Sequence, residues 1–229
     1  MLSNETTPTT GNNTSLTIIG GKFTLRVDED TPGAIPRKLT KGKNEGTEVW
    51  EMKYSTLIGH IAGGRITSGE FPGVDIDIVD DKANDRYTIN FPLDSRYLYD
   101  LIKRLPNVDT SSEVSLEVVE GKKKTRQGNP TYNLHVAQNG KVLYDYYTEW
   151  KKDTSGKPVP TLLHGMPEPV HGPKGWSFEA QENWLLERFE ELFADYKAPE
   201  CDIPSLPEDD TPPDDEFYPA DDDGEEAPF

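Results

Sequence analysis

Alternation of apolar and polar residues dominates the first two thirds of the chain and predicts a domain rich in β-strands. The segment 22–27, KFTLRV, places Phe23, Leu25 and Val27 on one face and polar residues on the other. Further segments either alternate in the same way or are rich in the β-branched and aromatic residues that favour strands. These five predicted strands cover residues 47–67, 73–79, 85–91, 113–119 and 131–137, and an additional strand is expected at 141–150.

Two segments change to the period of an amphipathic helix. The first begins at Asp94 or Ser95, has apolar residues at helical spacing and ends at Pro106. The second covers 177–196, and its apolar side comprises Leu185, Phe189, Leu192, Phe193 and Tyr196. We expect this helix to pack its apolar side on its own domain, as most such helices do. The alternative is a helix that binds a partner or a second copy of the chain, which leaves a homo-oligomer open.

The order of these elements predicts an OB-fold. Three strands joined by short turns, one helix and two further strands match a five-stranded Greek-key barrel with a helix after its third strand. Gly59, Gly63 and Gly64 interrupt the first strand, and glycine within a strand commonly marks a bulge or a barrel corner. We therefore expect a mainly β protein in four parts. These are a disordered N-terminal arm (1–20), an OB-fold-like domain with extra strands (21–150), a Pro/Gly-rich connector with the amphipathic helix (151–197), and a disordered acidic tail (198–229).

The charge of the chain is concentrated at its C-terminal end. The formal net charge is −18, from 42 acidic and 24 basic residues, and hydrophobic residues make up only 33% of the chain. Thirteen of the acidic residues and none of the basic ones lie in 200–229. The remainder of the chain is close to neutral, so the overall acidity does not argue against a polyanionic ligand. The low hydrophobic fraction favours unstructured ends.

Nothing in the sequence predicts export or membrane insertion. The N-terminal segment has neither the basic start nor the apolar stretch of a signal peptide. No run approaches the roughly 18 apolar residues that a membrane helix needs. The single cysteine, Cys201, has no partner for a disulfide within the chain. We therefore expect a soluble cytoplasmic protein without membrane contact.

The residue types of enzyme active sites are present but are not spaced for catalysis. The four histidines lack the spacing of a metal site, and no phosphate-binding loop or nucleophile elbow is found in the sequence. Asp75 and Asp77 alternate onto one strand face. Such pairs hold a metal in some nucleases, but more often they form a solvated face. We expect no catalytic residue, no metal and no cofactor, with a metal-dependent nuclease as the remote alternative.

Two clusters of cations stand out from the nearly neutral body. RKLTKGK (37–43) and KKKTR (122–126) each place four cations within seven residues or fewer. In the predicted fold the second cluster lies in the loop between strands four and five, one of the loops with which OB-folds bind single strands. Cations attract phosphates and aromatic side chains stack on bases, although each aromatic residue has a core position as its alternative. The predicted nucleic-acid-binding residues are Arg37, Lys38, Lys41, Lys43, Arg65, Lys122, Lys123, Lys124 and Arg126, with the aromatic residues Trp50, Tyr54, Phe71, Tyr132 and Tyr147.

The last nine residues, DDDGEEAPF, predict a docking segment. A tail that serves only solubility does not need a terminal Phe, whereas an acidic run can steer an aromatic end toward a basic pocket. A barrel with basic loops and an acidic tail that ends in Phe resembles the single-stranded DNA-binding proteins of bacteria and, more closely, of their phages. The resemblance implies that the tail contacts a polymerase, helicase or primase and competes with DNA for the cationic groove. The residues that carry the resemblance are Asp221, Asp222, Asp223, Glu225, Glu226, Ala227, Pro228 and Phe229.

The sequence therefore predicts a non-enzymatic single-stranded DNA-binding protein of replication or recombination, located in the host cytoplasm if a phage encodes it. Its partners would be single-stranded DNA and replication proteins. The alternative is an acidic interaction protein or DNA mimic that binds a DNA-processing enzyme without binding nucleic acid. The lysines of 122–126 separate the two hypotheses, because a mimic does not need them. RNA is an alternative ligand, because base stacking does not distinguish the two sugars.

Overall fold

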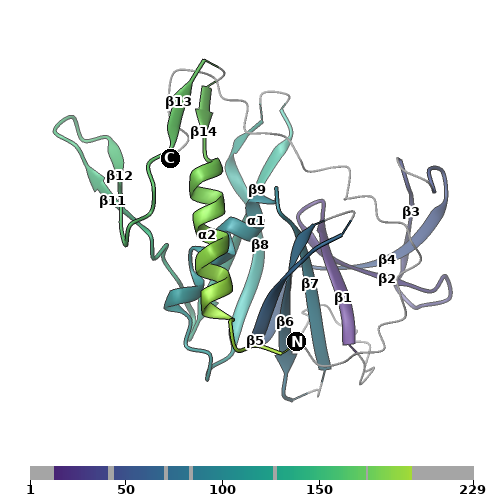
Figure 1. Ribbon diagram of the computed structural model, residues 1–229. Helices are drawn as coiled ribbons and strands as arrows, with labels where there is room; N and C mark the ends of the chain where they lie inside the picture. Colours follow the sequence, from purple (N-terminus) through teal and green to yellow (C-terminus); the bar gives the residue numbers. More distant parts are fainter. Residues whose placement is uncertain are drawn as a thin grey trace.

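The computed structural model describes residues 13–40, 44–69, 72–82, 85–125, 128–173 and 175–197. Within these ranges the protein is mainly β, which confirms the predicted class. Ten strands form one large mixed sheet, two pairs of strands form separate hairpins, and two α-helices lie against the sheet (Figure 1). No helix in the described ranges is long and apolar enough to span a membrane.

The five strands predicted for the main domain are all present. They are β5 (Thr56–Thr67), β6 (Gly73–Asp80), β7 (Asp85–Pro92), β8 (Val114–Lys124) and β9 (Pro130–Gln138). The first predicted strand also contains β4 (Glu48–Tyr54), which Ser55 separates from β5. The helix α1 (Arg96–Ile102) connects β7 to β8, as predicted. The inward side chains of these strands and the apolar side of α1 form one buried core.

The N-terminal strands enlarge the sheet beyond the five predicted barrel strands, and one of them is the strand predicted at 22–27. Three strands are involved, β1 (Asn13–Ile19), β2 (Lys22–Val27) and β3 (Ile35–Lys38). β1 pairs in parallel with β7 and then antiparallel with β2, while β4 lies between β2 and β3. The prediction of a disordered arm over 1–20 is therefore wrong for the residues of β1, because Leu16 and Ile18 are buried in the core. β3 lies in a segment expected to be a loop, and as an edge strand it accommodates Pro36.

The predicted closed barrel is not found among the described strands. The sheet has the open order β10-β9-β8-β5-β6-β7-β1-β2-β4-β3, where β10 is Lys141–Val142. Closure of the five predicted strands would require β7 to pair with β9, but β1 occupies the edge of β7 and β10 occupies the edge of β9. Of the strand predicted at 141–150, β10 is the only part that joins the large sheet.

The C-terminal helix α2 (Glu179–Leu192) packs where β5 lacks side chains. Gly63 and Gly64 follow a bulge in β5. A Cβ atom at Gly64 would lie 2.5 Å from Cζ of Phe189, and one at Gly63 would overlap the ring of Tyr196. Because successive strand residues point to opposite faces, Phe189 lies on the core face of the sheet and Tyr196 on its outer face. The two glycines therefore leave the space that Phe189 of α2 and Tyr196 after it occupy.

The expected packing of α2 on its own domain is confirmed. Leu185 and Phe189 belong to the buried core, although Leu192 at the end of the helix is 49% exposed. The connector before α2 contains two hairpins that the sequence did not predict, β11 (Thr148–Lys152) with β12 (Pro158–Leu162) and β13 (Val170–Gly172) with β14 (Gly175–Ser177). Figure 1 shows these hairpins on the same side of the molecule as α2, whereas β2, β4 and β3 extend on the opposite side.

Candidate nucleic-acid interface

The β8–β9 hairpin carries the described part of the second predicted cation cluster. β8 continues to Lys124 and β9 begins at Pro130, so most of the predicted loop is a paired arm. Lys122 and Lys124 are exposed on this arm. Several predicted sites lie outside the described residues, namely Lys41, Lys43, Phe71 and Arg126, the side chain of Lys123, and the tail residues Asp221, Asp222, Asp223, Glu225, Glu226, Pro228 and Phe229. The arm thus presents two described lysines to solvent.

Tyr132 lies at the base of this arm, against the turn between β1 and β2. It pairs with Glu120 across the hairpin, is half-buried and packs on the edge of the core. A Cβ atom at Gly21 would lie within 2.8 Å of three atoms of the Tyr132 ring, so the ring rests directly on this glycine. The φ of Gly21 is +69°, which also favours glycine. The contact brings the arm next to Lys22, the residue that follows Gly21.

A second group of cations lies on one face of β2, β4 and β3. The pairing of these strands places Lys22, Arg26, Lys53 and Arg37 on the same face as Glu51. Glu51 is fully buried and accepts a hydrogen bond of 2.6 Å from Nε of Arg37. The Nζ atom of Lys53 lies 3.8 Å from the other carboxylate oxygen, Oε2. Arg26, Arg37 and Lys53 therefore lie around this carboxylate, whereas Lys22 lies further along the same face, where its Nζ atom donates a hydrogen bond of 2.9 Å to Oγ of Ser55. We call this surface the β2–β4–β3 basic face.

Sequence reasoning missed three members of this face, Lys22, Arg26 and Lys53. The polar side of the segment 22–27 was visible in its alternation, but the sequence did not reveal which strands would lie beside it. Register with β4 is what adds Lys53 to the two cations of β2. The missing information was therefore the pairing of strands.

The first predicted cluster is divided between the two faces of β3. Arg37 belongs to the β2–β4–β3 basic face, whereas Lys38 and the half-buried Trp50 lie on the opposite face. Neighbouring positions of a strand point in opposite directions, so adjacency in sequence separates these two cations in space. The structure therefore does not bring Arg37 together with Lys38 or Trp50.

Two of the predicted stacking residues are buried, and for them the prediction is wrong. Tyr54 has no exposed area, and burial raises the pKa of its hydroxyl. Tyr147 is 6% exposed and packs edge-on against Tyr146 and Trp184, with ring centroids 5.1 and 4.9 Å apart. Aromatic residues in a strand pattern can face either the core or solvent, and these two complete the core. In the segment 141–150 the exposed aromatic residues are Tyr144, at 86%, and Trp150, at 49%.

The outer face of β5 and β6 neutralises its own charges. Asp75 accepts hydrogen bonds from Nη2 of Arg65 at 2.6 Å and from Nδ2 of Asn90 at 2.9 Å. Asp75 is 8% exposed and Asp77 is 2% exposed, so the prediction that this pair forms a solvated face is wrong. Arg65, a predicted nucleic-acid-binding residue, is paired with Asp75 and adds no net charge to this face.

Asp77 binds Tyr196, which follows α2 in the chain, on the same outer face. It accepts hydrogen bonds of 2.5 Å from Oγ1 of Thr88 and from the hydroxyl of Tyr196, and Nη1 of Arg86 lies 3.8 Å away. Burial, together with the hydrogen bond to Asp77, raises the pKa of Tyr196 to about 12. The face of β6 and β7, where an OB-fold would bind a single strand, thus carries buried carboxylates and contacts Tyr196.

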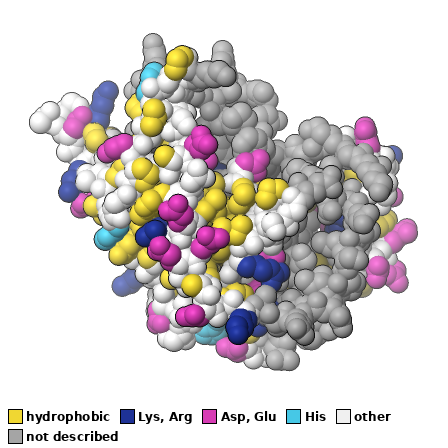
Figure 2. Space-filling view, viewed as in Figure 1, with side chains coloured by type: hydrophobic (Ala, Val, Ile, Leu, Met, Phe, Trp, Pro, Cys, Tyr) yellow, Lys and Arg dark blue, Asp and Glu magenta, His cyan; other side chains and the backbone are white. Residues whose placement is uncertain are grey.

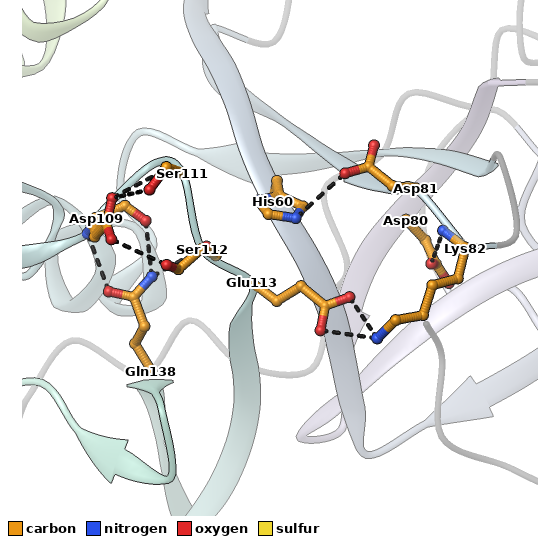
Figure 3. A network of polar contacts seen from close by, with 9 residues as sticks. All are labelled: His60, Asp80, Asp81, Lys82, Asp109, Ser111, Ser112, Glu113 and Gln138. Atoms are coloured by element: carbon orange, nitrogen blue, oxygen red, sulfur yellow. Dashed lines mark hydrogen bonds and ion pairs between the residues drawn. The ribbon is translucent and has the colours of Figure 1, made fainter.

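A separate polar network joins β5 to the loops around it. His60 lies 3.3 Å from Asp81 in the turn after β6, and Lys82 lies 2.8 Å from Glu113 before β8 (Figure 3). Asp109 accepts hydrogen bonds from the two serines Ser111 and Ser112, which lower its pKa. In the part of the chain that the structure describes, no group of three or more His, Cys, Asp or Glu side chains could hold a metal ion. We therefore assign this network a structural role.

The side of the molecule that carries α2 is acidic. Glu187, Glu190, Glu191 and Asp195 are exposed, and Arg188 is paired with Glu191 at 2.7 Å. Figure 2 shows acidic side chains interspersed with hydrophobic ones over this helix. A phosphate backbone is repelled by such a surface. The β8–β9 arm and the β2–β4–β3 basic face are therefore the candidate interface among the described residues.

Comparisons of the chain with known proteins do not identify a relative. No family model, curated protein or solved structure matches the chain. The charge, exposure and contacts of the chain's own residues are therefore the basis on which a function is proposed.

Proposed function

We propose that this protein is a non-enzymatic single-stranded DNA-binding protein that coats and protects the strand in replication or recombination. Its domain is proposed to be an opened variant of the OB-fold. Five strands in order, with a helix between the third and the fourth, support this proposal. In this variant β1 takes the edge of β7 that barrel closure would otherwise use.

The observation that carries the proposal is the β8–β9 arm. It combines two exposed lysines, Lys122 and Lys124, with a partly exposed aromatic ring, Tyr132, at its base. Lysines attract the phosphates of any sequence, and an aromatic ring stacks on any base. Stacking requires a base whose face is accessible, which a single strand offers and a duplex does not. The combination therefore favours single-stranded nucleic acid as the ligand.

We further propose that residues 221–229 recruit a polymerase, helicase or primase. The carboxylate and ring of Phe229 would enter a small pocket with a basic rim, while the acidic residues before it accelerate the encounter. The same acidic residues can compete with DNA for the protein's own cations. Binding of DNA would then release the tail to its partners.

The β8–β9 arm can be tested by fluorescence anisotropy with labelled oligo-dT and a matched duplex across a salt series. The wild type should prefer the single strand and bind more weakly as salt rises. The variant Lys122→Gln/Lys124→Gln should lose affinity by roughly ten-fold at low salt. Its dependence of log affinity on log salt should become less negative by about 1.4, which is about 0.7 for each lost phosphate contact.

The matched control is Lys151→Gln/Lys157→Gln, which removes the same charge from exposed positions of β11 and the turn that follows it. This control should bind like the wild type. Equal losses in both variants would mean that net charge alone matters and that the arm is not a site. Absence of binding by the wild type at low salt would reject the proposed function and favour a protein partner instead.

A further inference from the structure

The β2–β4–β3 basic face has more positive charge than its own carboxylate can neutralise. Glu51 is the acidic residue among the described positions of this face in β2, β4 and β3; three of the four cations lie around it, and Lys22 lies at the other end of β2. Arg26 is paired with Glu51 across the sheet, Arg37 bonds to Oε1, and Lys53 is 3.8 Å from Oε2. With Lys22 included, four cations and one carboxylate give the face a formal charge of +3.

Glu51 also organises the cations that surround it. Its Oε2 atom has no hydrogen-bond partner, and Arg37 donates to its Oε1 atom through Nε. The Nη atoms are the ones with which a guanidinium binds a phosphate in a bidentate manner. A buried carboxylate that fixes an arginine by its Nε atom orients that arginine for an anionic ligand.

We propose that the β2–β4–β3 basic face binds the phosphate backbone of the same single strand that the β8–β9 arm holds. This inference rests on the proposed function and extends its site by a surface on the N-terminal strands. Lys22 and Arg26 are four residues apart on β2, which corresponds to roughly 13 Å along the strand. The face is therefore long enough to contact more than one phosphate.

The contact between Tyr132 and Gly21 places the base of the arm beside the start of β2. Gly21 lies under the Tyr132 ring at the base of the arm, and Lys22 is the first cation of the basic face. Tyr132 shares the core face with Leu134 and Val136, and Lys22 points away from the core face of Phe23. A strand that connects the two surfaces would therefore cross the turn at Gly21 before it meets Lys22 and the cations of β4 and β3. Ile35, which is 54% exposed, lies on the same face and offers an apolar contact for a base. Cations interleaved with apolar side chains suit a ligand that alternates phosphates and bases.

The test compares oligo-dT of about 6 nucleotides, near the lower end of the site sizes of OB-folds, with oligo-dT of about 20 nucleotides, which exceeds the upper end. The variant Lys22→Gln/Lys53→Gln should bind the short oligonucleotide like the wild type and bind the long one more weakly. For the long oligonucleotide its salt dependence should become less negative by about 1.4, at about 0.7 for each lost contact. Lys122→Gln/Lys124→Gln should weaken the binding of both lengths, and Lys151→Gln/Lys157→Gln is again the matched control.

A second measurement uses the wild type and does not depend on the folding of a variant. Acetylation of lysines, read by mass spectrometry, should show Lys22 and Lys53 protected by the long oligonucleotide and not by the short one. Lys122 and Lys124 should be protected by both. Lys151 and Lys157 should react equally with and without DNA.

The outcomes separate the failure of this inference from the failure of the proposed function. If the arm lysines respond to DNA and Lys22 and Lys53 do not, the extended site is rejected and the proposed function stands. If no lysine responds and the wild type does not bind, both are rejected. If a synthetic peptide of residues 200–229 protects Lys22 and Lys53 while DNA leaves them reactive, the face binds an acidic polypeptide, and the inference is overturned.

Discussion

The outer face of β5 to β7 and the β2–β4–β3 basic face are both charged sheet surfaces, but they differ in charge balance. On the first, Asp75 and Asp77 lie beside Arg65 and Arg86, so the charges cancel. On the second, one carboxylate, Glu51, shares the face with four cations. The carboxylates of both faces are at least nine-tenths buried. Burial of a charged side chain therefore does not distinguish a structural pair from a ligand site.

The difference lies in what remains after the carboxylates are paired. A buried carboxylate persists only with partners, and on the outer face this pairing leaves no net charge for a ligand. On the basic face the surplus cations repel one another, and an anionic ligand relieves that repulsion. The comparison indicates that a charged strand predicts a binding site only when its neighbours in the sheet leave charge uncompensated.

The largest expected effect is that of Asp77→Ala on stability. The change removes the acceptor of Thr88 and Tyr196 and leaves Arg86 without its partner in a site that is 2% exposed. Removal of one member of a buried pair costs about 3–5 kcal/mol, so urea unfolding should give a free energy of unfolding that is lower by this amount. The folded variant should bind oligo-dT like the wild type.

The control for this change is Asp81→Ala, since the side chain of Asp81 is 70% exposed. It should leave the free energy of unfolding nearly unchanged. Similar losses for the two variants would contradict the structural role of Asp77 and with it the contrast between the two faces.

An intermediate effect is expected for Glu51→Gln, with opposite signs for stability and binding. Glutamine keeps an acceptor for Nε of Arg37 but removes the buried charge, so the free energy of unfolding should fall by about 1–3 kcal/mol. Affinity for long oligo-dT should rise, because the face gains one unit of positive charge. The measurements are urea unfolding and anisotropy on the same preparation.

Glu48→Gln makes the same charge change on the opposite face of β4 and should alter neither quantity appreciably. Weaker DNA binding by Glu51→Gln would contradict the expectation that the net positive charge of the face determines its affinity for DNA. It would mean instead that the carboxylate's orientation of Arg37 dominates.

The smallest expected effect is that of Tyr196→Phe, which should lower the free energy of unfolding by about 1 kcal/mol at neutral pH. Folding raises the pKa of Tyr196 from 10.0 to about 12, chiefly through burial and the hydrogen bond to Asp77. The neutral hydroxyl is thus favoured in the folded state. Its contribution should be complete below pH 10 and should be lost as the pH rises from about 10 to about 12. Urea unfolding at several pH values should show the difference between wild type and variant narrowing over this range. A constant difference would contradict the bond to Asp77.

Local patterns were sufficient for the elements whose burial follows their own sequence. Apolar and polar residues alternate in the predicted strand 85–91, and its apolar residues Tyr87, Ile89 and Phe91 are all buried in β7. The helix over 179–192 was visible in its apolar period for the same reason. β1 and β3 were missed because their own sequences carry no clear alternation and their strand conformation depends on pairing. β1 pairs with β7 and β2, and β3 pairs with β4.

The candidate site was less accessible to sequence reasoning than the fold. The cluster at 122–126 was recognised because its cations are consecutive. Arg65 was assigned to DNA although it is paired with Asp75, and Tyr54 and Tyr147 were assigned although they are buried. The burial of Tyr54 and Tyr147 depends on neighbours that are distant along the chain. Asp75 lies only ten residues from Arg65, but the two become neighbours through the pairing of β5 with β6.

By itself the sequence determined the mainly β class, the amphipathic helix and the separation of a nearly neutral body from an acidic tail. These properties depend on composition and on spacing over a few residues. The tertiary structure alone decided that the sheet stays open at β7 and that cations of β2, β3 and β4 share one face. Strand pairing decides both, because register between distant segments sets which edges are filled and which charges become neighbours.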